Sequence, residues 1–123
     1  MGYGTFTKWT PNGTDCESLS AVTTGTGKGK PVNDCREIWG SLVSSGTISG
    51  GAIVFEANSV SPDYSGTWHN LDTVDSTDFT ALSGGATYET ARFAGTYGFT
   101  RWRITSNVTG GGSITAKCNG LLG

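Results

Sequence analysis

Two stretches of the sequence decide the fold: Ala52–Val60, which reads AIVFEANSV, and Thr100–Val108, which reads TRWRITSNV. In both stretches apolar residues alternate with polar ones. Side chains of a β-strand point alternately to its two faces, so this period of two predicts strands with one face on a core and the other toward solvent.

The alternation also predicts which side chains lie in the core. Ile53 and Phe55 fall on one face of the first strand, while Trp102 and Ile104 share a face of the second. Arg101 and the other polar residues fall on the opposite faces. We therefore expect these four apolar side chains to form the centre of the domain, because burial of each contributes about 1.5–3 kcal/mol.

Around these two stretches the chain consists of short runs separated by turns rich in glycine, serine and aspartate. A helix remains an alternative for Cys35–Val43, although Gly40 favours a strand there, and Gly25–Pro31 is expected to be a flexible connection. The further predicted strands are Cys16–Thr24, Cys35–Val43, Trp68–Leu71, Ala86–Ala94 and Ser113–Cys118. About seven or eight short antiparallel strands at this spacing predict an all-β domain, a β-sandwich or jelly roll.

The first 13 residues differ from the rest and predict an extended N-terminal arm. Tyr3, Phe6 and Trp9 recur at every third residue, which matches neither a strand face nor a helix stripe, and Pro11–Gly13 ends the segment with a turn signal. We expect residues 1–13 to form the arm and residues 14–123 to form a single β-sandwich domain.

Composition and charge narrow the classes of partner. Glycine accounts for 20 of the 123 residues, and charged residues for only 15%. This low charge, combined with many aromatic residues, argues against disorder. The formal net charge of −2 predicts no nucleic-acid or membrane partner, because both need clustered positive charge. No run has the character of a signal peptide or membrane span, so we expect folding in a cytoplasm.

The three cysteines do not form a recognisable framework. Cys16, Cys35 and Cys118 are odd in number and include no CxxC pair, so buried free thiols are expected rather than a zinc site. A bridge between Cys16 and Cys35 stays open, on the condition that their two strands pair. No cofactor and no metal are predicted.

The acidic residues and the single histidine give no catalytic constellation. Asp72, Asp75 and Asp78 are spaced by three, with Asp63 upstream, which lacks the alternate-residue pattern of an EF-hand. We interpret them as solvated turn residues and leave a calcium ion as the alternative. His69 lies near Asp72 without a nominated nucleophile or metal, so no enzymatic activity is predicted.

Three aromatic residues suggest a second kind of function. Tyr64, Trp68 and Trp102 could form a flat platform that stacks on a sugar, as in carbohydrate-binding modules. Aromatic residues of a β-sandwich are more often part of its core, because each buries a large area. The core is therefore the preferred interpretation, and the platform is the alternative.

The C-terminal three-fifths of the chain, Gly46–Gly120, carries a resemblance. The segments GTISGGAIVFEANSV, SPDYSGTWHNL and GFTRWRITSNVTGGGSITAKCNG occur in that order. This arrangement of a strand after glycine-rich sequence, a "GTW" strand, an "RWR" strand and a glycine-rich hairpin resembles small bacteriophage virion proteins. These are capsid decoration (cement) proteins and β-sandwich proteins of head or tail fibres.

The resemblance implies a non-enzymatic structural protein at the capsid surface of a virion, made in the host cytoplasm. Its expected partners are the major capsid protein and sister subunits in a homo-oligomer such as a trimer. Tyr3, Phe6 and Trp9 of the arm are then the candidate interface, since aromatic side chains bury much area for few rotatable bonds. The alternative is a glycan- or receptor-binding module on a tail or head fibre, with Tyr64, Trp68 and Trp102 as its platform.

Overall fold

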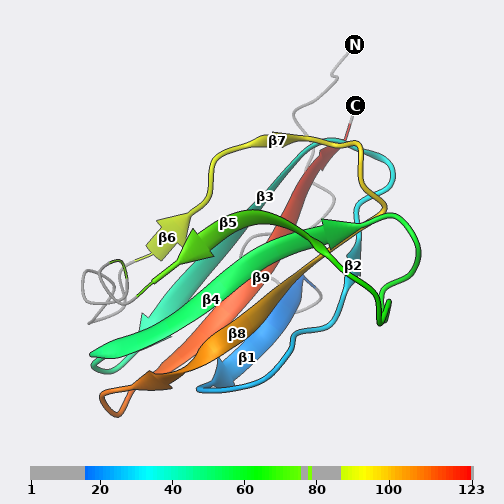
Figure 1. Cartoon of the computed structure of the whole chain (residues 1–123). Coiled ribbons are helices and arrows are strands. Elements are labelled where there is room, and N and C mark those ends of the chain that lie inside the picture. Colours follow the sequence, from blue (N-terminus) through cyan, green and yellow to red (C-terminus); the bar gives the residue numbers. More distant parts are fainter. Residues whose placement is uncertain (1–15, 76–77, 79–86, 123) are drawn as a thin grey trace.

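The computed structural model describes residues 16–75, 78 and 87–122 of the chain, and in these residues it shows two antiparallel β-sheets packed face to face (Figure 1). The strands are β1 (Glu17–Val22), β2 (Lys30–Pro31), β3 (Cys35–Ser45), β4 (Gly50–Asn58), β5 (His69–Val74), β6 (Thr87–Glu89), β7 (Phe93–Ala94), β8 (Phe99–Thr109) and β9 (Ser113–Leu122). The predicted all-β sandwich is confirmed. In the described residues no helix has the length and apolar character that crossing a membrane requires.

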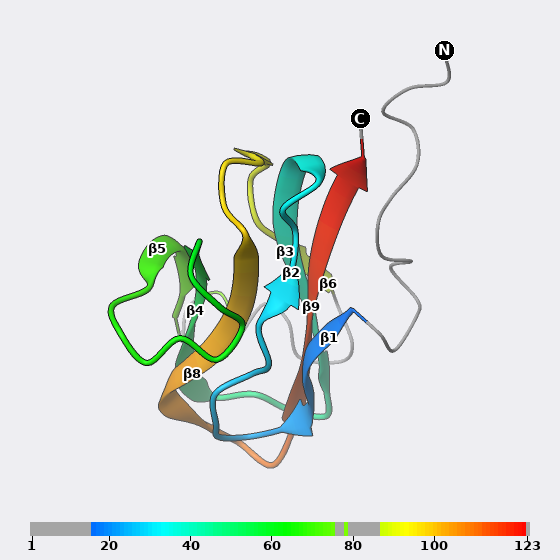
Figure 2. The same ribbon diagram turned by 90° about the vertical axis from the view of Figure 1, so that its right-hand side faces the viewer.

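The strand order is that of a jelly roll. Sheet A has the order β1-β9-β3-β6, with β7 also paired to β3, and sheet B has the order β2-β8-β4-β5. If β6 and β7 count as one interrupted strand, the first strand pairs with the last, the second with the second-last, and so on inward to β4 with β5. This nested pairing, folded over into two sheets, defines the jelly roll. Figure 2 shows the two layers from the side, with β4, β5 and β8 in one and β1, β3 and β9 in the other.

The core lies between the inner faces of the two sheets, as the alternation predicted. Ile53, Phe55 and Trp102 are fully buried, and Ile104 is partly buried against the same cluster. The rings of Phe55 and Trp102 lie 5.0 Å apart between centroids. A β-carbon on Gly40 would lie 2.5 Å from the Trp102 ring, so glycine is what lets sheet A approach this indole.

The segment Gly25–Pro31 is not the flexible connection that its glycines predicted. The amide of Gly27 donates to the carbonyl of Trp102 at 2.8 Å, and the amide of Ile104 donates to the carbonyl of Gly25 at 2.9 Å. The hydroxyl of Ser18 accepts from the Trp102 amide and donates to the Lys28 carbonyl. The glycines allow close backbone approach to β8 here, and the segment closes one side of the sandwich between β1 and β8.

The predicted strand Ala86–Ala94 is interrupted in the described part, Thr87–Ala94. β6 pairs with Ser41–Val43, and β7 pairs with Glu37 and Ile38. Between them the amide of Thr90 donates to the Gly40 carbonyl at 2.9 Å, and the Thr90 hydroxyl accepts from the Gly40 amide at 3.0 Å. The Thr90 hydroxyl thus accepts the hydrogen bond that a backbone carbonyl would accept in a continuous strand. The strand is therefore interrupted between β6 and β7. Cys35–Val43, by contrast, is a strand and not a helix, because β9 and these two short strands pair with it.

All three cysteines are buried, and no disulfide joins them. The condition for a Cys16–Cys35 bridge is not met, because β1 and β3 do not pair: β9 lies between them in sheet A. Cys35 lies opposite Leu122 instead.

Candidate functional site

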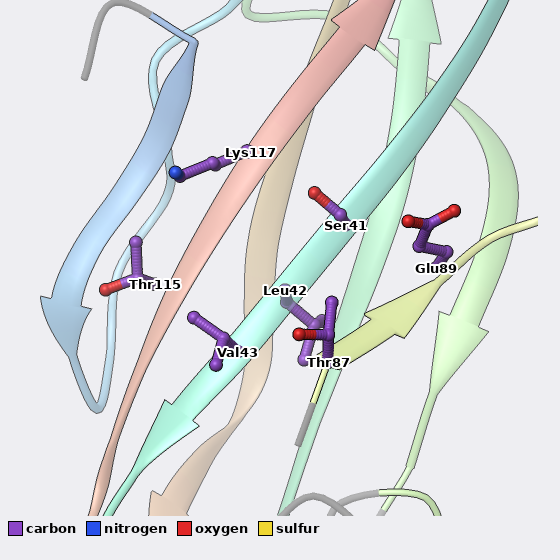
Figure 3. Close-up of a pocket in the computed structure, with 7 residues that line it drawn as sticks. All are labelled: Ser41, Leu42, Val43, Thr87, Glu89, Thr115 and Lys117. Carbon is purple, nitrogen blue, oxygen red and sulfur yellow. The ribbon is translucent and has the colours of Figure 1, made fainter. Parts of the chain in front are cut away.

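A shallow groove on the outer face of sheet A is the first candidate for a binding site. Figure 3 shows its side chains on three neighbouring strands, β3, β6 and β9. The groove has a volume of about 270 Å³ and is lined by Ser41, Leu42, Val43, Thr87, Glu89, Thr115 and Lys117. We refer to these seven residues as the sheet A groove.

Strand pairing arranges the sheet A groove in two rows. In the first row Ser41 lies directly opposite Lys117 on one side and Glu89 on the other. Because neighbouring strands are about 4.8 Å apart, the backbones that carry these two charged side chains are about 10 Å apart. In the second row Val43 lies between Thr115 and Thr87.

The polar groups of the groove differ in how far they are already engaged. The hydroxyl of Ser41 accepts from the amide side chain of Asn119 at 3.1 Å, and that of Thr115 accepts from the Ala21 amide at 3.0 Å. Among the described residues, the side chains of Thr87 and Glu89 have no hydrogen-bond or ion-pair partner. The β6 side of the groove therefore presents a hydroxyl and a carboxylate that a ligand could engage without displacing an internal bond.

The groove presents charged and hydroxyl groups for hydrogen bonding. It contains the carboxylate of Glu89 and the ammonium of Lys117 on opposite sides, with the hydroxyl of Ser41 between them. General acid–base catalysis needs a titratable group held within hydrogen-bond reach of a reacting atom, usually beside a second such group or a nucleophile–base pair. In the described part of the chain, no three His, Cys, Asp or Glu side chains gather as a metal site would require.

A second hollow, of about 290 Å³, lies between β5 and β7. It is lined by His69, Asn70, Leu71, Phe93, Ala94, Thr96 and Tyr97. His69 stacks on Tyr97 with 5.7 Å between ring centroids. The carboxylate of Asp72 instead accepts a hydrogen bond from the Tyr88 hydroxyl at 2.9 Å, which links β5 of sheet B to β6 of sheet A. This Asp72–Tyr88 bond joins the edge strands of the two sheets and so stabilises that side of the sandwich.

The Asp72–Tyr88 bond also changes the acidity of the phenol. Burial of Tyr88, and then its bond to the negatively charged Asp72, raises the pKa of Tyr88 from 10.0 to about 12. Both effects disfavour a phenolate beside a carboxylate. Tyr88 therefore remains a hydrogen-bond donor throughout the neutral range.

The three aromatic residues of the predicted sugar platform do not lie on one face. Trp102 is 0% exposed on the inner face of sheet B, where its indole N–H donates to the Lys117 carbonyl. Trp68 is 7% exposed and donates to the Tyr64 carbonyl at 2.7 Å. Since a sugar platform needs exposed ring faces, this structure gives Trp68 and Trp102 structural roles.

Trp68 belongs to a charged cluster on the outer face of sheet B that the sequence pattern did not reveal. Glu56 is 3% exposed and lies between Arg101 at 2.8 Å and Arg103 at 3.0 Å. The guanidinium of Arg101 lies 3.9 Å from the Trp68 ring centroid. The bonds to Glu56 raise the pKa of Arg103. Alternation placed the two arginines on one face of their strand, but only the register of β4 with β8 brings Glu56 beside them.

The candidate interface residues Tyr3, Phe6 and Trp9 lie outside the described residues. Comparison with protein-family models, with curated proteins and with solved structures finds no match to this chain. The resemblance to phage virion proteins therefore stays a prediction from the sequence.

Proposed function

We propose that this chain is a non-enzymatic structural protein of a bacteriophage particle, a capsid decoration protein that binds the major capsid protein. The observation that carries the proposal is the jelly-roll order of the strands. Jelly rolls are frequent in viral capsid domains, lectin domains and cupins. The resemblance of Gly46–Gly120 to virion proteins favours the first of these classes.

The surface supports a protein that binds rather than one that reacts. The sheet A groove lies on paired strands, so its hydroxyl and charged groups are held on a rigid surface. Opposite charges at Glu89 and Lys117 suit an interface that fixes the orientation of a partner, because complementary charges set register and specificity. Under this proposal the groove is part of the surface that meets the capsid protein.

One observation favours a second function, the binding of a glycan on a tail or head fibre. The groove offers hydroxyl, carboxylate and ammonium groups to a polyhydroxylated ligand, on a fold that lectin domains share. Its location differs from that of Tyr64, Trp68 and Trp102, so a glycan site would now be placed on sheet A.

The two functions are separated by adding purified protein to capsids that lack it and measuring co-sedimentation, followed by imaging of the lattice. We expect regular copies on the capsid and no binding on a glycan array. Specific glycan binding without capsid binding would replace the proposal by the second function.

The groove is tested with a double variant, Glu89→Gln with Lys117→Gln. It removes both charges, and we expect capsid affinity to fall roughly tenfold, which corresponds to about 1.4 kcal/mol. A matched control, Asp63→Asn with Lys28→Gln, makes the same change of charge at two exposed positions outside the groove. Equal binding by both variants would remove the groove from the interface.

A further inference from the structure

Two of the buried cysteines lie opposite each other at one end of the β1–β9 ladder. Glu17 pairs with Lys117, so Cys16, one residue before β1, opposes Cys118, one residue later on β9. The amide of Cys118 donates to the carbonyl of Cys16 at 2.9 Å, which fixes this register directly. Both residues are 0% exposed, so both side chains lie on the inner side of sheet A.

The α-carbon separation expected of this placement lies within the range that a disulfide spans. Opposed residues of an antiparallel pair that share backbone hydrogen bonds have α-carbons about 5.5 Å apart. Disulfides span α-carbon separations of about 4.4–6.8 Å, and most lie near 5.5–6 Å. We propose that Cys16 and Cys118 are a disulfide site, whose oxidation joins the start of β1 to β9.

Cys35 is not a competitor within the folded chain. It lies at the start of β3, opposite Leu122, on the far side of β9 from β1. The three cysteines thus consist of one facing pair, Cys16 and Cys118, and a separate third residue, Cys35. This arrangement accounts for their odd number.

The closed fold protects both thiols. Disulfide formation needs a thiolate, and burial raises the pKa of Cys118 from 9.0 to about 12. Access comes through β1, an edge strand of six residues whose one paired strand is β9 and whose register contains two irregularities. Opening it also breaks the hydrogen bonds of Ser18 to Trp102 and Lys28. Ala21 in β1 also has a positive φ of 51°, which is strained for a residue with a β-carbon. Local opening of β1 therefore exposes both sulfurs together.

The oxidant is a small disulfide of the glutathione type. In the opened strand one cysteine thiolate attacks a sulfur of the oxidant and releases one small thiolate, which leaves a mixed disulfide. The second cysteine thiolate attacks the protein sulfur of that mixed disulfide and releases the other small thiolate. Two protein thiols become one disulfide, and one small disulfide becomes two small thiols.

A reducing cytoplasm keeps the pair as thiols, and an oxidising exterior favours the bond. The bond closes a loop of about 100 residues, and for loops of this length a rise in Tm on the order of 10 °C is expected. It restrains the edge strand that opens most readily, so the oxidised protein would resist unfolding from that edge.

The test uses the full chain with Cys35→Ser, which leaves only the facing pair. The reduced protein is treated with oxidised glutathione at about pH 8, where an exposed thiol is partly ionised, in urea below the unfolding midpoint. We expect both free thiols to be lost, a peptide cross-linked between Cys16 and Cys118 to appear in non-reducing mass spectrometry, and the Tm to exceed that of the reduced form. Cys16→Ser, which leaves Cys35 and Cys118, is expected to show no such rise.

Contrary outcomes are equally specific. Two glutathione adducts, or two thiols that persist through oxidation, would show that the sulfurs cannot reach each other. A cross-link that lowers the Tm would show that the native register does not accommodate the bond. Wild-type protein, compared before and after oxidation, provides the same readings should a variant fail to fold.

Discussion

At the scale of single residues, the two largest fully buried side chains, Trp102 and Phe55, both lie on the inner face of sheet B. Phe55 is fully buried between Trp102 and Phe93, with ring centroids 5.0 Å and 6.4 Å away. Phe55→Ala removes these contacts and leaves a cavity, so we expect the free energy of unfolding to fall by about 3–5 kcal/mol in urea titrations. Val60→Ala, at a side chain that is 66% exposed, is the control and should change stability by less than about 0.5 kcal/mol.

Glu56 holds together the charged cluster on the outer face of sheet B, because it pairs with both Arg101 and Arg103. Removing its charge leaves Arg101 and Arg103 as neighbouring like charges, and Arg101 is only 14% exposed in its side chain. Breaking a buried ion pair costs about 3–5 kcal/mol, and the 39% exposure of Arg103 reduces this through solvent screening. We expect Glu56→Gln to lower stability by about 2–3 kcal/mol.

Glu89→Gln makes the same chemical change at an exposed carboxylate without a partner among the described residues, and provides the control in thermal and urea unfolding. If Glu56→Gln unfolds at the same midpoint as this control, the cluster contributes nothing to stability.

The phenol of Tyr88 makes stability depend on alkaline pH. Its folded-state pKa is about 12, above the ordinary 10.0, so the folded protein retains a proton that the unfolded chain releases. The contribution is therefore complete below about pH 10 and is lost as the pH rises toward 12.

Tyr88→Phe tests this dependence by urea midpoints at about pH 9 and about pH 11. The wild type should lose more stability between these pH values than the variant, while Cys118, present in both, contributes equally to each. Parallel losses in the two proteins would contradict the role assigned to the Asp72–Tyr88 bond.

At the scale of elements, the sequence predicted best where one strand is long and has one face on the core. β4 and β8 were foreseen from alternation alone, together with their inward residues. Two features were not foreseen: β2, which has only two residues and is held by β8, and the break between β6 and β7, where the Thr90 hydroxyl accepts a hydrogen bond from β3. Neither feature produces an alternation of apolar and polar residues that could be recognised in the sequence.

The segment before β2 offers a test of its close approach to β8. A β-carbon at Gly27 would collide with Ser18 and with the backbone of Trp102. We expect Gly27→Ala to lower the free energy of unfolding by about 1–3 kcal/mol, because neighbouring backbone has to move. At Gly98 the nearest atom to an added β-carbon is 3.5 Å away, so Gly98→Ala should be tolerated. If Gly27→Ala leaves the free energy of unfolding unchanged, the segment Gly25–Pro31 is a loose connection, as the sequence predicted.

At the scale of the whole molecule, a sequence can predict a β-sandwich, but it does not predict the order of the strands within each sheet. The sheet A groove illustrates the difference: Ser41, Glu89 and Lys117 are distant in sequence and become neighbours only through pairing of β3 with β6 and β9. Tyr64, Trp68 and Trp102 were the more visible candidates because aromatic residues stand out in a sequence. The register of the sheets assigned two of them to buried positions.

The arm predicted for residues 1–13 gives a prediction about assembly. Tyr3, Phe6 and Trp9 each could contribute roughly 1.5–3 kcal/mol if buried on another chain, before the entropy of ordering the arm is subtracted. Deletion of Met1–Thr10 should leave the circular dichroism spectrum and Tm of the domain close to those of the intact protein, and should weaken oligomerisation or capsid binding. Light scattering and capsid co-sedimentation measure both. Unchanged assembly by the shortened protein would assign the arm no role in contacts.

The central place of β9 in sheet A has a consequence for biosynthesis. β9 separates β1 from β3, yet the ribosome makes it after every other strand of the sandwich. Until it emerges, β1 has no partner in the sheet, and the inward side chains of Ile114 and Ala116 are missing from the core. Until translation of the sandwich is complete, the inward side chains of the earlier strands therefore lack the part of their packing that β9 provides, and it is during this interval that a chaperone would have most to shield.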